Sequence, residues 1–411
     1  MTTAAADNPG LPHTRSQAHH LTGFWLVTGA VVILQAFATL PTPLWPLYAQ
    51  RDGLSSTLVT VAFAAIVVGT VTGLTLFGHL SDRFGRRRVI VPALVVGIGA
   101  AVVMMTSPAY PGLLVGRFLT GLAVGVVAST ATTYLSDLYR AARPSSSTRF
   151  PSTVASIAIL GGLSLGPLVA GAIVQWFTAP LVTPYLVFIV AMAVGIVAVL
   201  VSPETVDRQA FRTERAPRFR LQAGQRLAFI GASAVAFCSF AGFGVLLSLG
   251  SLIVQNELHV TAPFIWGLAS FVALGVSAIS QVALGALPPR WMLGLGTGAV
   301  AAGFLVIIIG LFNPSMTLFL IGAAIGGAGL GLLFKSALAV AVTTADPGSR
   351  AGVIARFYTT AYIGQGLPPV LLAFATSFVS AQAGLSGFAV VIVAVTLVAA
   401  RLQVSALRAK S

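Results

Sequence analysis

The chain has 411 residues, of which 57% are hydrophobic and only 8% are charged. Charged residues make up about a quarter of an average soluble domain, so the composition excludes an ordinary soluble protein and predicts a membrane protein. The net charge of +14 comes from 23 Lys and Arg against 9 Asp and Glu. These basic residues are spread over many short segments, which argues against a nucleic-acid-binding domain.

Twelve apolar runs reach the length of about 20 residues that a spanning helix needs. They lie at about 24–48, 57–80, 88–107, 112–138, 150–177, 183–201, 227–253, 262–287, 291–311, 315–343, 351–378 and 384–402. Backbone polar groups must be paired within lipid, and long continuous apolar runs do not fit the alternating strands of a barrel. We therefore expect an all-α membrane protein with twelve transmembrane helices.

Residues 1–22 are mostly polar or small and are expected to form an N-terminal tail without a cleavable signal. The tail contains His19 and His20, but two adjacent histidines without further ligands are a weak metal signal, so no metal site is predicted. In the first span, Pro41, Pro43 and Pro46 should interrupt the outer half of the helix. Trp45 and Tyr48 are then either gate or cavity residues, or members of an interfacial aromatic belt.

A compact charged turn, Gly78-His79-Leu80-Ser81-Asp82-Arg83-Phe84-Gly85-Arg86-Arg87-Arg88, separates the second and third spans. Glycine permits a tight turn, the carboxylate can accept hydrogen bonds, and arginines suit a cytoplasmic membrane face. The turn resembles the loop between the second and third helices of the major facilitator superfamily of transporters. The resemblance implies two six-helix bundles that rock about a central site, and a gating role for Gly78, Asp82, Arg83, Gly85, Arg86 and Arg87.

The fourth span contains Arg117-Phe118-Leu119-Thr120-Gly121, which resembles the arginine motif of that helix in the family. The resemblance implies that Arg117 takes part in proton transfer or coupling. The alternative is that Arg117, some five residues from the outer end, snorkels to water. Asp137 and Glu257, near span ends, are the other coupling candidates, because no carboxylate lies at mid-membrane. Asp137 can pair with Arg140 or the loop arginines, and Glu257 is either an outer gate residue or an interfacial charge.

The fifth span holds residues 162–171, with Gly162, Gly166, Pro167 and Gly171, and resembles the family motif associated with antiporters. Ala170 replaces the glycine that is usual in that motif. Small residues four apart let helices approach closely, and a proline bends the helix. The resemblance implies export driven by ion exchange, while helix packing alone is the structural alternative.

A polar stretch near the middle of the chain divides six spans from six. We expect an N-terminal bundle over 23–202, a linker over 203–226, a C-terminal bundle over 227–403 and a tail over 404–411. A weak repeat supports this division, since an offset of 202 residues aligns Gly162 with Gly364 and Pro167 with Pro369. Transporters built from repeated halves commonly bind substrate between the halves, near the bilayer midplane.

Lys335 is the most suggestive single residue, because it lies within the tenth span and the chain has only two lysines. It either attracts an anionic substrate group or titrates during transport; a lysine paired with carbonyls or snorkelling to the cytoplasm is the structural alternative. Buried polar groups without partners are costly, so several others should also face the cavity. The cavity candidates are Gln35, Tyr134, Gln281, Lys335, Tyr358, Tyr362 and Gln365.

The basic residues also predict orientation. With both termini cytoplasmic, twenty of them lie on the cytoplasmic side and Arg51 alone lies on the opposite side. We expect a monomeric plasma-membrane transporter, not an enzyme, that exports a small organic solute by proton antiport. It needs no cofactor, and its partners are the solute, lipids and a proton or other coupling ion. The alternatives are a proton-coupled importer of a small metabolite and a non-transporting sensor.

Overall fold

A computed structural model describes residues 11–77, 80–107, 109–147, 149–205 and 219–408. The N-terminal half contains α1 (Leu11–Thr39), η1 (Thr42–Leu44), α2 (Trp45–Asp52), α3 (Ser56–Thr72), η2 (Gly73–Phe77), α4 (Leu80–Phe84), α5 (Arg86–Thr106), α6 (Tyr110–Ala142), α7 (Arg149–Trp176) and α8 (Thr183–Val201). The C-terminal half contains α9 (Arg226–Ser248), α10 (Gly250–Asn256), α11 (Pro263–Ala283), α12 (Pro289–Phe312), α13 (Met316–Thr344), η3 (Pro347–Ser349), α14 (Arg350–Ala375) and α15 (Ala381–Arg408).

Among the described residues, eleven helical segments are long and apolar enough to cross a membrane, the first of them running from α1 through α2. The twelfth long helix is α14, with 26 residues. Its sequence carries the polar residues Tyr358, Tyr362 and Gln365. The prediction of an all-α membrane protein with twelve spanning helices is confirmed.

The first span differs from its predicted bounds at its N-terminal end. Helix α1 begins at Leu11, so residues 11–22 of the predicted tail continue the first span as helix. At the other end α1 stops at Thr39, and the chain continues through η1 and α2. This interruption falls at Pro41 and Pro43, as predicted, because proline lacks the N–H group that a continuing helix requires.

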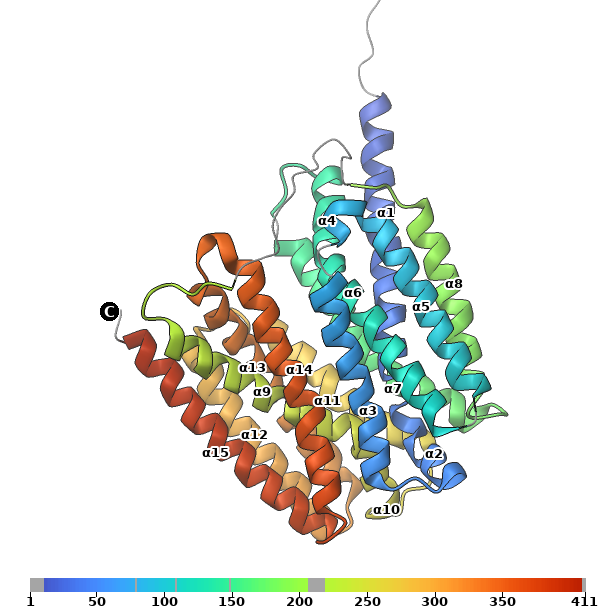
Figure 1. Cartoon of the computed structure of the whole chain (residues 1–411), viewed down its shortest axis with the longest axis vertical. Coiled ribbons are helices and arrows are strands. Elements are labelled where there is room, and N and C mark those ends of the chain that lie inside the picture. Colours follow the sequence, from blue (N-terminus) through green and yellow to red (C-terminus); the bar gives the residue numbers. More distant parts are fainter. Residues whose placement is uncertain (1–10, 78–79, 108, 148, 206–218, 409–411) are drawn as a thin grey trace, which may run out of the picture.

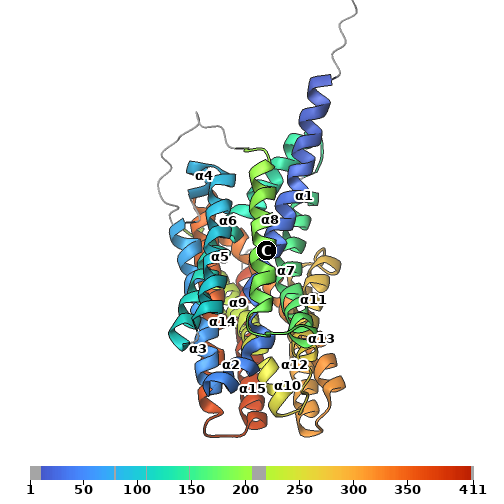
Figure 2. The same ribbon diagram turned by 90° about the vertical axis from the view of Figure 1, so that its right-hand side faces the viewer.

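The helices form two groups, drawn in blue to green and in yellow to red (Figure 1). The groups meet where α7 packs on α11 and where α3 packs on α14. At the first contact Gly267 lies directly against the Pro167 carbonyl, too close for any side chain. In both views α7 lies beside α11 (Figure 2).

Large apolar side chains are exposed on the outer helices. On α8 they include Val190, Val194 and Val197, and on α15 they include Val390 and Val398. Helix α9, in contrast, is mostly buried. Soluble proteins rarely expose such rows of apolar side chains, whereas a helix at the edge of a membrane bundle faces lipid on this side.

The sequence repeat that aligns Gly162 with Gly364 is also seen in the helix packing. Gly162 of α7 lies against α1, with Gln35 as a neighbour, and Gly364 of α14 lies against α9 at Phe237. The offset of 202 residues that relates the two glycines also relates Gln35 to Phe237. The same close helix contact therefore occurs once in each half.

Candidate functional site

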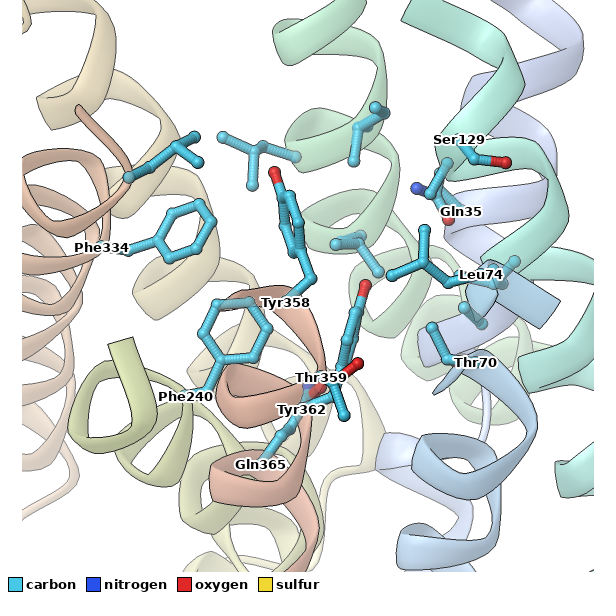
Figure 3. Close-up of a pocket in the computed structure, with 18 of the residues that line it drawn as sticks. Gln35, Thr70, Leu74, Ser129, Phe240, Phe334, Tyr358, Thr359, Tyr362 and Gln365 are labelled. Atoms are coloured by element: carbon cyan, nitrogen blue, oxygen red, sulfur yellow. The ribbon is translucent and has the colours of Figure 1, made fainter. Parts of the chain in front are cut away.

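A cavity of about 2450 Å³ lies between the two groups of helices. Gln35 and Thr70 line it from the N-terminal half, and Tyr358 and Gln365 line it from the C-terminal half (Figure 3). The cavity extends to Phe84, at the end of α4, and to Phe219 and Gly348 across from it. It therefore opens toward the face that bears α4, which we call the α4 face.

The opposite end of the cavity is closed by hydrogen bonds between the two halves. The Trp45 indole N–H donates to the Leu247 carbonyl at 3.2 Å, and the Ser251 hydroxyl donates to the Thr42 carbonyl at 2.8 Å. All four residues are buried. We call this end the α2 face; the chain is open on the α4 face and shut on the α2 face.

One side of the cavity carries an aromatic wall, made of Phe240, Phe334, Tyr358 and Tyr362. Phe240 lies 5.1 Å from Phe334 and 5.3 Å from Tyr362 between ring centroids. Phe334 and Tyr358 are 5.9 Å apart, and Phe357 supports them from behind. These separations are those of favourable tilted and edge-to-face pairs, so α9, α13 and α14 present one continuous aromatic surface.

Both tyrosines of this wall direct their hydroxyl groups into the space between the halves (Figure 3). Among the described residues, neither the Tyr358 nor the Tyr362 hydroxyl has a hydrogen-bond partner. A phenol hydroxyl both donates and accepts. Two polar groups of the wall therefore remain open for a bound molecule or water.

Lys335 lines the cavity from α13, and its ammonium group donates to the Gln281 carbonyl of α11. Gly285 provides the room for this contact, since a Cβ atom there would overlap the lysine tip. An ammonium group has three donors, and the carbonyl uses one. Within the described part of the chain, no carboxylate lies within ion-pair distance of Lys335, so its positive charge is not neutralised.

Gln35 faces the aromatic wall from α1, on the other side of the cavity (Figure 3). Its side chain is 1% exposed, and its Oε1 atom is buried without a hydrogen-bond partner in the described structure. Leaving a buried acceptor unpaired costs roughly 1–3 kcal/mol. The unpaired amide therefore marks a place where a ligand or water should bond.

Arg117 borders the cavity toward the α2 face and is only 1% exposed. Its Nη1 donates to the Ala38 carbonyl at 2.8 Å. The guanidinium carbon lies 5.5 Å from the Trp45 ring and 5.9 Å from the Phe63 ring. These contacts hold the arginine inside the bundle, so the snorkelling interpretation is wrong.

The described residues include only part of the charged turn. Gly78 lies outside the described residues, and the side chains of Asp82 and Arg83 in α4 do too. Gly85 directly precedes α5 and has a φ of 99°, at which a residue with a side chain would be strained. Its neighbour is a residue that the sequence did not indicate: the Glu204 carboxylate accepts from the Arg86 and Arg87 backbone N–H groups at 3.0 and 3.1 Å.

The arginines of the turn join it to α8 and α6 on the α4 face. Arg87 donates to the Leu200 carbonyl at 2.8 Å, and Arg86 donates to the Ser81 hydroxyl at 2.9 Å. Arg86 Nε also lies 3.6 Å from an Asp137 carboxylate oxygen. Asp137 therefore pairs with an arginine of the turn, one of the two partners expected for it.

Tyr134, a predicted cavity residue, and Glu257, a coupling candidate, both lie away from the cavity lining. The hydroxyl of Tyr134, which is buried in α6, donates to the Pro203 carbonyl at 2.7 Å, so its placement as a cavity residue is corrected. Glu257 ends α10 near the α2 face, where it accepts a hydrogen bond of 2.8 Å from Gln382 of α15. Tyr134 instead joins α6 to the segment that carries Glu204.

The antiporter-like segment of α7 packs in two directions. Gly162 and Gly166 lie against α1, where Gly166 contacts the Ala36 carbonyl. Gly171 approaches the Pro263 carbonyl of α11, and the Pro167 carbonyl meets Gly267 there. The segment thus joins contacts inside the N-terminal half to a contact between the halves.

The charge of the cavity has one sign. Its described lining residues include Arg117, Lys335 and Arg356, and none of them is acidic. Arg356 is exposed near the α4 face, where its guanidinium lies 5.3 Å from the Phe219 ring. Among the described residues, a molecule that enters from the α4 face therefore passes Arg356 and then reaches Lys335, neither of which has an acidic partner there.

Sequence reasoning missed half of the aromatic wall. Tyr358 and Tyr362 were identified as cavity candidates, but Phe240 and Phe334 were not. Phenylalanine is common in apolar spans, so the sequence alone does not show which rings face a cavity. The four-residue spacing of Tyr358 and Tyr362 puts both on one helix face, and it was the sequence signal for an aromatic surface on that helix.

A sequence model described as the Major Facilitator Superfamily matches residues 27–291. The bacillibactin exporter of Bacillus subtilis (strain 168) is 24% identical over 346 residues, which are 80% of this chain and 84% of the exporter. The glucose transporter GlcP of Staphylococcus epidermidis is 33% identical over 93 residues, 22% of this chain. That match spans only 21% of the glucose transporter. Inositol transporter 4 of Arabidopsis thaliana is 36% identical over 21% of this chain, and the match spans 14% of the inositol transporter.

Solved transporter structures share the fold. The nucleoside transporter NupG aligns with a TM-score of 0.73 at 11% identity, over 94% of this chain and 99% of its own. The human organic anion transporter MFSD10 (TETRAN) gives 0.61 at 16% identity, covering 95% and 99% of the two chains. A bacterial Spinster homologue in an inward-facing, unoccupied conformation gives 0.60 at 15% identity, covering 97% and 96%.

Proposed function

Because the chain belongs to the Major Facilitator Superfamily, we propose that it is a secondary active transporter that exports a small organic solute by proton antiport and alternating access. The observation that carries this proposal is the large cavity between two helix bundles, open on the α4 face and shut on the α2 face. One end open and one end closed is what alternating access requires of each state.

The proposed orientation places both termini and the α4 face in the cytoplasm. The α4 face carries the arginines of the charged turn, and basic residues favour the cytoplasmic side. In this orientation the state described here is open to the inside and ready to take up solute from the cytoplasm. The proposed location is the plasma membrane, with the chain working as a monomer.

Export, as opposed to uptake, is supported by the antiporter-like segment of α7 and by the similarity to the bacillibactin exporter along most of both chains. The matches to sugar and inositol transporters are short. Import of a small metabolite by proton coupling remains the second candidate, and the two differ in the direction of net movement.

The coupling site is proposed among Arg117, Asp137 and Glu257, because the described cavity lining contains no carboxylate. Asp137 is the strongest of the three. Protonation of its carboxylate would weaken its ion pair with Arg86, which joins α6 to the charged turn on the α4 face. A proton taken up there would change contacts at the open end of the cavity.

Inverted membrane vesicles from cells that produce the protein test direction and coupling together. A panel of radiolabelled organic solutes is offered with an imposed pH gradient, acid inside, and again without one. Export by antiport predicts accumulation in inverted vesicles that collapses with the gradient. Accumulation only in right-side-out vesicles under an inward proton gradient would instead establish the importer.

A further inference from the structure

We propose that the substrate is an organic anion with a flat aromatic body, held between Lys335 and the aromatic wall. This inference rests on the proposed transport function and names the chemical class of what is carried. Four features support it: the sign of the charges in the cavity, the aromatic wall, the unpaired polar groups of both bundles, and the room that Gly285 makes for the lysine.

The charges favour an anion over a cation. Lys335 and Arg356 line the cavity without a neutralising carboxylate within the described structure, and Arg117 borders its far end. Within the described lining a cationic solute would meet only like charges, whereas a carboxylate, sulfonate or phosphate group finds the two remaining donors of the Lys335 ammonium. Such charge-assisted hydrogen bonds are about twice as strong as neutral ones.

The aromatic wall favours a flat apolar body. Phe240, Phe334, Tyr358 and Tyr362 come from three helices, and their rings border the same space. Phe334 and Lys335 are consecutive residues of α13, and both line the cavity. A planar ring bonded to an acidic group fits such a pair of neighbouring features, because aromatic rings prefer offset and edge-to-face contacts with one another.

The unpaired polar groups require more than an acid group on a ring. Gln35 offers an amide across the cavity, and the two tyrosines offer their hydroxyls from the wall (Figure 3). A substrate with hydroxyl or amide substituents would pair with these groups. Drug-sized ligands fill cavities of about 300–1,000 Å³, so in this open state the substrate occupies part of the cavity and water fills the rest.

The test uses the purified full chain in lipid nanodiscs and four probes that differ in one property each. These are 2-naphthoate, the neutral 2-naphthamide, the cationic 2-naphthylmethylammonium and the non-aromatic decalin-2-carboxylate. Isothermal titration calorimetry gives each affinity. We expect 2-naphthoate to bind with a Kd below about 1 mM, and to bind about tenfold more tightly than each of the other three.

Variants at the lysine separate charge from shape. Lys335→Ala should weaken 2-naphthoate about tenfold and leave 2-naphthamide unchanged, whereas Lys335→Arg should retain most of the affinity for the anion. Gly285→Ala should act like Lys335→Ala, because the added methyl group displaces the ammonium. Arg290→Ala removes one positive charge from an exposed position outside the cavity lining and is the matched control.

A variant of the wall tests the second feature. Phe334→Leu keeps an apolar side chain but removes the ring, and it should weaken 2-naphthoate several-fold while leaving decalin-2-carboxylate unchanged. Thermal unfolding of every variant, measured in the same nanodiscs, separates loss of binding from loss of folding. A folded Lys335→Ala protein that binds 2-naphthoate as tightly as the unaltered chain would overturn the proposal.

Two further results would also overturn it: a cationic probe that binds at least as tightly as the anion, or no binding of 2-naphthoate up to about 1 mM. The vesicle assay distinguishes these failures from failure of the transport function. Gradient-driven movement of 2-naphthylmethylammonium would support the transport function and contradict an anionic substrate. Binding of 2-naphthoate without movement of any solute would support the anion-binding site and contradict transport by antiport.

Discussion

The Trp45 indole joins the two halves of the chain: its N–H donates to the Leu247 carbonyl in the C-terminal half at 3.2 Å. The same ring lies 5.5 Å from the guanidinium of Arg117 in the N-terminal half. One side chain therefore takes part both in closing the α2 face and in holding a buried arginine. Any movement that opens the α2 face must break the first contact and is expected to disturb the second.

Trp45→Phe removes the indole N–H and keeps an aromatic ring beside Arg117. A typical hydrogen bond contributes about 0.5–1.5 kcal/mol, so the population open on the α2 face should rise about two- to tenfold. Labelling of a cysteine placed at Leu44, a buried position of η1 where it packs on α11, would report this increase as faster modification by an impermeant reagent. Trp25→Phe, at an exposed position of α1, should leave the rate unchanged; equal rates in both variants would contradict the assignment.

Arg117→Lys keeps the charge but loses the planar guanidinium between two rings. Lysine is not equivalent at a stacked site, and the cation–π and hydrogen-bond terms together suggest a loss of about 1–3 kcal/mol in stability. Thermal unfolding in detergent checks this. Arg51→Lys, in an exposed pair with Asp52, should cost less than about 1 kcal/mol, and a similar loss in both variants would show that burial at Arg117 is not decisive.

Gly267→Ala places a methyl group against the Pro167 carbonyl, where α11 meets α7. Overpacking of this kind costs about 1–3 kcal/mol, so the unfolding temperature should fall. Gly275→Ala, on the same helix, meets only the Ser164 hydroxyl at 4.0 Å and should gain up to about 1 kcal/mol of helix propensity. If both variants raised the unfolding temperature, the close contact between the bundles would be refuted.

Glu204→Gln tests the cap of α5. The carboxylate accepts from two backbone N–H groups at the start of that helix, where a negative charge is favourable. Its loss should lower stability by about 1 kcal/mol. Asp346→Asn is the control, because within the described residues the Asp346 carboxylate has no hydrogen bond or ion pair. Unfolding curves that coincide for the two variants would argue against the cap.

The sequence predicts the helices well because their cause is local. Long apolar runs between basic loops require spanning helices in lipid, and Pro41 and Pro43 break the first span where they occur. Gln35, Gln281, Lys335, Tyr358, Tyr362 and Gln365 were selected as polar groups within spans, and all six line the cavity. The cost of burying a polar group is the physical reason to expect such residues at a cavity.

Contacts between distant segments could not be predicted in the same way. Glu204 caps a helix that begins 118 positions earlier, and nothing in its own segment indicates this. Tyr134 resembles a cavity residue in sequence, but the Pro203 carbonyl lies within reach of its hydroxyl and holds it elsewhere. Arg117 lies near a span end, yet Trp45 and Phe63 keep it inside. Each of these outcomes depends on tertiary packing.

Alternating access is tested most directly by two pairs of spin labels in the full chain. One pair, at Gln50 and Asn256, spans the α2 face, and the other, at Thr75 and Gly348, spans the open end on the α4 face. Double electron–electron resonance in nanodiscs at several pH values gives both distance distributions. Alternating access predicts two populations in each pair, with the Gln50–Asn256 distance lengthening as the Thr75–Gly348 distance shortens. Distances that stay fixed under every condition, or that lengthen together, would contradict it.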